Sequence, residues 1–338
     1  MKKLLNTLYI TTQGSYLHKE RETIVIKVGD DKVKQLPALN IEHIMCFGQV
    51  SVSPFLMGYC GESGIGLSFF TEYGKFHARV QGNQSGNVLL RRTQYRVADD
   101  EIRANAIAQI FVGAKIANAR TVLMRELRNH GENSSIKSAV LRLSDSLTYC
   151  AKTKTVAQTM GIEGEAAATY FEIFNELLRG SGFKFNGRVR RPPTDPVNAL
   201  LSFIYSLWTK ECAHALQGVG LDPYVGFLHQ DRPGRLSLAL DLLEEFRAPI
   251  ADRLVLTLIN RKQIQIKDFV QESSGAVRLT DDARKAVLTA YQERKQEEIT
   301  HPFLNEKMAI GLIPHYQALL LARHLRGDTA HYPPYLLK

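Results

Sequence analysis

The sequence predicts a two-domain α+β protein, with a small, mostly β domain followed by an all-α domain. The chain has 338 residues, enough for two separate hydrophobic cores. Its first ninety residues contain short runs of β-branched and aromatic residues, whereas apolar residues recur at helical spacing from about Val88 onward. The polar stretch Asn83–Asn87 separates the two patterns, so we place the domains at residues 1–87 and 88–338.

Strands are expected in the first domain wherever a β-branched and aromatic run ends at turn residues. Gly29–Asp31 and Tyr73–Gly74 are the clearest turn signals. One segment of this domain predicts a helix instead, with Ser53 as its N-cap, Pro54 in its first position and Gly61 just past its end. The expected strands are residues 8–12, 23–28, 43–47, 65–70 and 76–80.

Helices are expected through the second domain, with a flexible loop at residues 129–135. Their apolar residues recur every three or four positions, which is typical of helices that pack one face against a core. The expected helices are residues 101–127, 138–155, 196–217, 237–247, 249–259, 281–297 and 313–326.

Composition restricts the class of protein. The net charge of +9 and the pI near 9.3 indicate a polyanionic partner, although charge says nothing about fold. Residues 1–7 lack the apolar run of a signal peptide, and no segment is long enough to span a membrane. The four cysteines are scattered and form no Cys-x-x-Cys pair, which argues against a zinc ribbon and for reduced thiols in a cytoplasmic protein.

Two segments place carboxylates on apolar helix faces. Glu163 begins a row that continues at helical spacing through Ala166, Tyr170 and Phe174. In a second helix, Asp241 and Glu244 lie one turn apart on one face. A carboxylate that faces a core is costly unless something compensates its charge. The alternative for Glu163 is a glutamate near a helix N-terminus, stabilised by the helix dipole.

His229 precedes the turn at Pro233–Gly234, which leads into the helix of Asp241 and Glu244. A histidine on one arm of a turn can face carboxylates on the other arm. One imidazole with two or three carboxylates suits Mg²⁺ or Mn²⁺ better than a structural zinc ion, so we predict a divalent cation shared by Glu163, His229 and Glu244. The alternative for His229 is a partly buried side chain with an ordinary hydrogen-bond partner.

A basic cluster lies between the two acidic segments. It contains no acid and includes Phe183 and Phe185, which we expect to stack on unpaired bases while the cations bind phosphate. A solvated surface is the alternative. The cations of this cluster are Lys184, Arg188, Arg190 and Arg191, and a second, weaker patch near the domain boundary comprises Arg79, Arg91 and Arg92.

The apolar helix after Asp195 carries two polar residues, Asn198 and Tyr205, seven positions apart on one face. We expect Asn198 to be an interior residue with hydrogen-bond partners. Tyr205 is a candidate active-site hydroxyl.

Taken together, four ordered motifs resemble the CRISPR spacer-acquisition integrase, a metal-dependent endonuclease family. The C-terminal Tyr332–Leu336 and the basic proline-rich segment are similar to the lineage found with subtype I-C systems. The motifs are residues 162–171, 190–205, 226–229 and 238–247.

The resemblance implies an N-terminal β-sandwich, a C-terminal α-helical catalytic domain and a homodimer formed through the N-terminal domains. It implies a heterohexamer in which a small ferredoxin-like partner dimer bridges two such dimers, and it leaves open whether an iron–sulfur trimming nuclease takes part. The family's metal ligands correspond to Glu163, His229 and Glu244. Asp241 lies one turn before Glu244, so the third ligand is Glu244 or Asp241.

The implied chemistry is insertion of short double-stranded DNA protospacers into a CRISPR repeat as new spacers. A 3′-hydroxyl attacks a repeat-boundary phosphodiester by transesterification, with Mg²⁺ or Mn²⁺ as cofactor. Two other functions stay open: a metal-dependent repair nuclease acting on branched DNA, and a non-catalytic DNA-binding scaffold.

Overall fold

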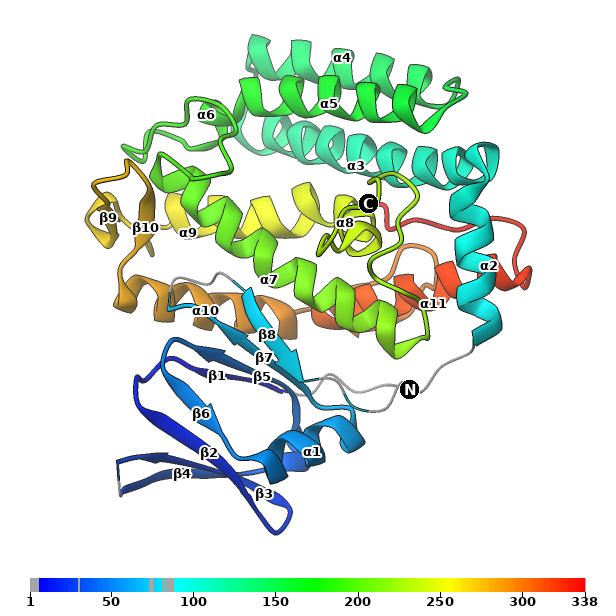
Figure 1. The fold of residues 1–338 in the computed structure, drawn as a ribbon. Helices are drawn as coiled ribbons and strands as arrows, with labels where there is room; N and C mark the ends of the chain where they lie inside the picture. Colours follow the sequence, from blue (N-terminus) through cyan, green and yellow to red (C-terminus); the bar gives the residue numbers. More distant parts are fainter. Residues whose placement is uncertain (1–5, 30, 73–75, 81, 83–87, 338) are drawn as a thin grey trace. The chain divides into compact units, whose positions relative to one another are not determined.

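A computed structural model describes residues 6–29, 31–72, 76–80, 82 and 88–337. Contacts divide the chain into two compact units, the first of residues 1–85 and 284–296 and the second of residues 86–283 and 297–338. The predicted division into domains at residues 1–87 and 88–338 stays a prediction. The α+β class with N-terminal strands and a mostly helical remainder is confirmed (Figure 1).

The first unit contains two four-stranded sheets that pack against each other (Figure 1). One sheet has the order β1-β5-β7-β8, with β1, β5 and β7 parallel, and the other has the order β4-β3-β2-β6. Both contribute to one core, for example through Ile44 from the first sheet and Leu17 and Ile24 from the second. The strands are β1 (Asn6–Ile10), β2 (Ser15–Glu20), β3 (Thr23–Val28), β4 (Asp31–Pro37), β5 (Ile41–Phe47), β6 (Val50–Val52), β7 (Gly66–Phe70) and β8 (Phe76–Val80).

All five expected strands are present, but β2, β4 and β6 were not predicted. The first two carry several charged or polar residues, so they lack the apolar signal that identified the others. The helix capped by Ser53 is confirmed as α1 (Pro54–Ser63), but it ends at Gly64, which adopts φ 70°, and not at Gly61. The expected turn at Tyr73–Gly74 lies outside the described residues.

The C-terminal part of α10 (Asp281–Gln296) belongs to the first unit. Lys295 Nζ lies 3.3 Å from Thr7 Oγ1 on β1, and the guanidinium of Arg284 donates to the carbonyl of Glu72. A helix far along the sequence therefore packs with the N-terminal strands.

The second unit is a helical assembly in which α3, α4 and α5 lie side by side (Figure 1). Helix α7 packs against α8 and α11. The helices are α2 (Val88–Asp99), α3 (Glu101–His130), α4 (Ser134–Cys150), α5 (Val156–Glu172), α6 (Phe174–Leu177), α7 (Pro196–Gly218), α8 (Ser237–Glu244), α9 (Arg253–Asn260) and α11 (Ile313–Arg326).

Short elements complete this unit. Two separate helices were expected at residues 237–247 and 249–259. Instead, the π-helical turn η2 (Arg247–Asp252) joins α8 to α9 and contains Pro249. Two short antiparallel pairs, not predicted, are β9 (Phe269–Gln271) with β10 (Val277–Leu279) and β11 (Glu298–Thr300) with β12 (Lys307–Ala309). The loop expected at residues 129–135 is shorter, because α3 continues to His130 and α4 begins at Ser134. None of the described helices is both long and apolar enough to cross a membrane.

Candidate active site

Helix α5 carries Glu163 in its middle. Thr155 caps the helix by accepting from the amide of Gln158, so the helix begins at Val156 and Glu163 lies two turns inside it. The alternative of a helix N-terminal glutamate is therefore wrong. The apolar row that follows is real, since Ala166 and Tyr170 are buried. Glu163 itself retains 19% exposure and lies at the edge of the core.

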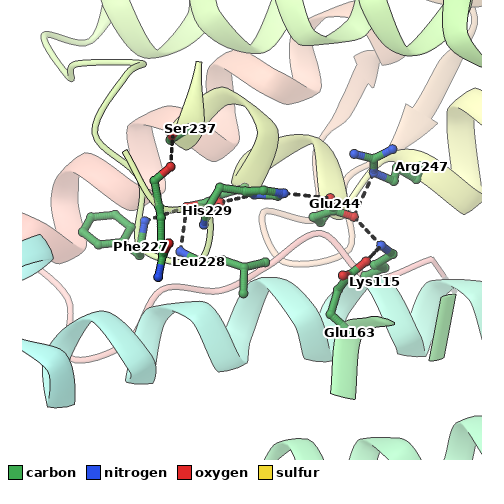
Figure 2. Close-up of polar contacts among 10 residues, drawn as sticks. Lys115, Glu163, Phe227, Leu228, His229, Ser237, Glu244 and Arg247 are labelled. Atoms are coloured by element: carbon green, nitrogen blue, oxygen red, sulfur yellow. Dashed lines mark hydrogen bonds and ion pairs between the residues drawn. The ribbon is translucent and has the colours of Figure 1, made fainter. Parts of the chain in front are cut away.

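Helix α8 presents two buried carboxylates with different partners. Asp241 is 0% exposed and Glu244 is 2% exposed. The carboxylate of Asp241 accepts from the backbone amides of Phe227 at 2.7 Å, Leu228 at 3.0 Å and His229 at 3.0 Å. Asp241 therefore fixes the loop before α8, whereas Glu244 points toward α3 and α5 (Figure 2).

His229 is oriented by Asp241. Its Nδ1 lies 2.7 Å from Asp241 Oδ1, which makes Nδ1 the protonated ring nitrogen. The free lone pair is then on Nε2, which lies 4.0 Å from Glu244 Oε1 (Figure 2). This contact favours Asp241 as an acceptor that orients His229 and Glu244 as the third ligand.

Lys115 on α3 joins the carboxylates from the two acidic segments. Its Nζ contacts Glu163 Oε1 and lies 2.7 Å from Glu244 Oε2 (Figure 2). The side chain is only 12% exposed. The sequence analysis did not identify Lys115; the only available signal was a cation among the buried residues of α3, which include Val112 and Ile116.

A second cation contacts the same oxygen of Glu244. Arg247 Nε lies 2.8 Å from Glu244 Oε2. Burial raises the pKa of the Glu244 carboxyl, but the charges of Arg247 and Lys115 outweigh burial, and the pKa is lowered well below its usual range. Glu244 is therefore ionised at neutral pH.

Tyr205 supports Arg247. The guanidinium of Arg247 lies 4.5 Å from the centre of the Tyr205 ring, and the Tyr205 hydroxyl donates to Asp252 Oδ1 at 2.5 Å. Burial raises the pKa of Asp252 to about 6, although the Tyr205 hydrogen bond and the nearby cations, Lys115 among them, lower it. The hydroxyl of Tyr205 is buried and engaged, and its role in the active site stays a prediction.

The donor set fits a divalent cation. Glu163 and Glu244 share one positive charge, and Nε2 of His229 is directed toward Glu244. These are carboxylate and imidazole donors of the kind that bind Mg²⁺ or Mn²⁺. In the described part of the chain no three His, Cys, Asp or Glu side chains are close enough to form a ready metal site, and the Lys115 ammonium lies between the two glutamates.

The basic loop contains both anchored and exposed cations. Arg188 Nη1 donates to Asn198 Oδ1 at 2.7 Å and Arg188 Nη2 donates to Ser202 at 3.1 Å, so Arg188 ties the loop to α7. Asn198 is buried and fully bonded, as predicted. Lys184, Arg190 and Arg191 are exposed.

The expectation that Phe183 and Phe185 stack on bases is wrong. Phe183 is 9% exposed and contacts Phe269, and Phe185 is 2% exposed and packs between Phe171 and Phe174. Their alternation with cations places the aromatic rings in the core and the charges outside it.

Arg235, in the loop that joins His229 to α8, lies within electrostatic range of three other arginines. Burial lowers the pKa of Arg235, and the charges of Arg232, Arg191 and Arg190 lower it further despite Asp241. None of the four guanidinium groups forms an ion pair with a carboxylate among the described residues. Such a group of uncompensated cations suits a phosphate-bearing ligand. Arg232 and Arg235 were missed in the sequence, although they flank the Pro233–Gly234 turn.

The weaker basic patch is divided between the two units. Arg79 lies on β8 of the first unit, and Arg91 and Arg92 lie on α2 of the second. A DNA-binding role for these residues stays a prediction.

Glu245, the residue that ends α8, is a third buried carboxylate and is 0% exposed. Its carboxylate accepts from Tyr332 at 2.5 Å, Gln317 at 2.8 Å and the backbone amide of Tyr335 at 2.7 Å. Burial raises the pKa of Glu245 to about 8, although these hydrogen bonds lower it. Glu244 and Glu245 thus face opposite sides, and Glu245 binds the C-terminal segment.

The chain is similar to several known proteins over nearly its whole length. The family model of the CRISPR associated protein Cas1 matches residues 8–293. A CRISPR-associated endonuclease Cas1 of Chlorobaculum tepidum is 52% identical over 99% of both chains, and one of Rhodospirillum rubrum is 48% identical over 100% of both. A CAS1 protein structure from Thermotoga maritima covers 96% of this chain and 97% of its own, with a TM-score of 0.82 and 25% identity. A casposase bound to its integration product has a TM-score of 0.85 at 23% identity, over 98% of this chain and 94% of its own, which shows a shared fold.

Proposed function

Because this chain belongs to the Cas1 family of CRISPR-associated endonucleases, we propose that it inserts short DNA fragments into a CRISPR array. The reaction is attack of a fragment 3′-hydroxyl on a phosphodiester at the repeat boundary. One new phosphodiester forms as one breaks, and the leaving 3′-hydroxyl takes up the proton that the attacking hydroxyl loses. The observation that carries the proposal is that Glu163 on α5 and Glu244 on α8 meet at the ammonium of Lys115, with His229 Nε2 4.0 Å from Glu244.

Mg²⁺ or Mn²⁺ is the proposed cofactor, held by Glu163, Glu244 and His229 Nε2. Such an ion, when bound, polarises the phosphoryl oxygen and favours loss of the hydroxyl proton. The protein's part is to orient the donors. Asp241 holds the His229 ring in the tautomer that leaves Nε2 free, and Arg247 keeps Glu244 ionised in a nearly dry position.

Four arginines provide the proposed grip on DNA. Arg190, Arg191 and Arg232 are exposed and Arg235 is partly exposed, and the charges of the first three and of Asp241, the partner of His229, all act on Arg235. A phosphate backbone bound there would lie near the reacting groups. Guanidinium groups bind phosphate without reading base sequence. We therefore assign these residues to positioning of the DNA strand.

We also propose partners for this chain from its family. One structural relative is described as part of a Cas6-RT-Cas1–Cas2 complex, and another as a Cas1–DNA complex. We propose that this chain forms homodimers that a small Cas2-type subunit bridges into a heterohexamer on double-stranded DNA. An iron–sulfur trimming nuclease is a further candidate partner.

The deciding experiment offers a supercoiled plasmid containing the repeat and a short labelled duplex, with Mn²⁺ and the small partner subunit. Covalent transfer of label to the plasmid, lost in Glu163→Gln and His229→Ala, is the expected result. Cleavage without joining would instead support a repair nuclease acting on branched DNA. Binding without either reaction would support a scaffold.

A further inference from the structure

Lys115 contacts both proposed glutamate ligands, yet the proposed chemistry does not use it. It enters from α3, and its ammonium contacts carboxylates on both α5 and α8. A divalent cation that binds Glu163 and Glu244 must occupy the same space between them. Two positive charges cannot share that space, so the ammonium has to leave before the metal enters.

The structure contains a place for the ammonium to go. A cavity of about 20 Å³ adjoins Lys115. Most of its lining residues are apolar, and Tyr170, Tyr205, Arg247 and Asp252 are its other polar ones. One water molecule needs about 10–15 Å³ of such space, and an ammonium group is of similar size. The cavity therefore admits the end of the Lys115 side chain.

Asp252 gives the cavity an acceptor. This carboxylate is 1% exposed and accepts from the Tyr205 hydroxyl at 2.5 Å through Oδ1, and the Tyr170 hydroxyl also interacts with it. A buried carboxylate with spare acceptor capacity favours a cation beside it. Lys115 is near enough for its charge to act on Asp252.

We propose that Lys115 is a displaceable counterion, which bridges Glu163 and Glu244 before the metal binds and turns toward Asp252 when it does. The inference rests on the proposed function, because it takes these glutamates as metal ligands. Lys115 then keeps the two carboxylates close together without a metal and opposes metal binding by its own charge. It is a positioning residue and does not touch the DNA.

Three variants test the proposal through Mn²⁺ binding, measured without DNA from the electron paramagnetic resonance signal of free Mn²⁺. Lys115→Met removes the competing charge, so we expect Mn²⁺ to bind at least about tenfold more tightly, while the metal-free protein melts at a lower temperature in EDTA. Lys115→Arg keeps the charge but has a head group too large for the cavity, and Asp252→Asn removes the acceptor. Both should bind Mn²⁺ more weakly than the wild type.

Lys137→Met is the matched control, because this exposed lysine pairs with Glu132 and with none of the site residues. It should leave Mn²⁺ affinity unchanged. Equal or weaker Mn²⁺ binding by folded Lys115→Met would overturn the proposal, as a purely structural lysine would give that result. If Lys115→Met does not fold, unchanged Mn²⁺ affinity in both Lys115→Arg and Asp252→Asn overturns it.

Joining is measured separately on the same preparations. If the wild-type protein does not join DNA but the variants differ in Mn²⁺ affinity as expected, the proposed function is contradicted and the counterion role of Lys115 is supported. If the wild-type protein joins DNA but the variants all bind Mn²⁺ equally, the proposed function is supported and the counterion role is contradicted.

Discussion

Asp241 accepts four hydrogen bonds from the loop before α8, and its replacement by alanine removes them all. Three come from the backbone amides of Phe227, Leu228 and His229, which have no other acceptor at this position. A buried donor left without a partner costs about 1–3 kcal/mol, so the free energy of unfolding should fall by roughly 3 kcal/mol or more. At about 2–4 °C per kcal/mol, this corresponds to a decrease in Tm of about 6–12 °C.

Activity should fall further than stability alone explains. Without Asp241, the ring of His229 loses the acceptor that holds its Nδ1 protonated and directs Nε2 toward Glu244. Loss of such an orienting partner typically costs about 10- to 100-fold, and release of the loop adds to this. We therefore expect joining by Asp241→Ala to fall by more than about 100-fold at a temperature where the variant is folded.

The assay is thermal melting and joining on the same preparation, with Asp231→Ala as the control. Asp231 is an exposed carboxylate in the same loop, and its replacement should leave Tm unchanged. A wild-type Tm for Asp241→Ala, together with joining within about tenfold of the wild type, would refute the reasoning. It would mean that the loop holds its shape without this carboxylate.

Glu163→Gln should abolish joining but keep Tm within a few degrees, as measured by melting and label transfer; joining near the wild-type rate would remove Glu163 from the site. Arg232→Ala with Arg235→Ala should weaken binding of unrelated duplexes about equally and reduce the slope of log affinity against log salt by about one to two units, in binding titrations at several salt concentrations. Burial, and to a smaller extent the charge of the nearby Cys60 thiolate, raises the pKa of Cys46 to about 12. Iodoacetamide at pH 8 should therefore label the Cys46 thiol only after the protein is unfolded in guanidinium, which mass spectrometry measures. The pKa of Asp252 is raised from 3.8 to about 6, so folding favours its protonated form and the associated stability is lost as pH rises through about 6. The Tm of wild type relative to Asp252→Asn should therefore decline between about pH 4 and pH 7, and a rising difference would contradict this sign.

Local sequence patterns determined much of this protein. The β-branched runs identified β1, β3, β5, β7 and β8, and Ser53 with Pro54 fixed the start of α1, because these signals depend only on neighbouring residues. Helical spacing also identified Glu163, Asp241 and Glu244 as carboxylates on apolar faces. Such a pattern is informative on its own, since a buried charge requires a compensating partner wherever it lies.

The tertiary structure decided which partner each charge has. Lys115 lies 48 residues before Glu163 in sequence and is an ordinary lysine in an apolar helix until α3 packs against α5 and α8. Glu245 has the same local pattern as Glu244, yet only the packing of Tyr332 and Gln317 shows that it faces the opposite side. A buried charge is compensated by a group that is near it in space but can lie far from it in sequence. The sequence does not indicate which group this is, because the pair forms only when the helices pack together.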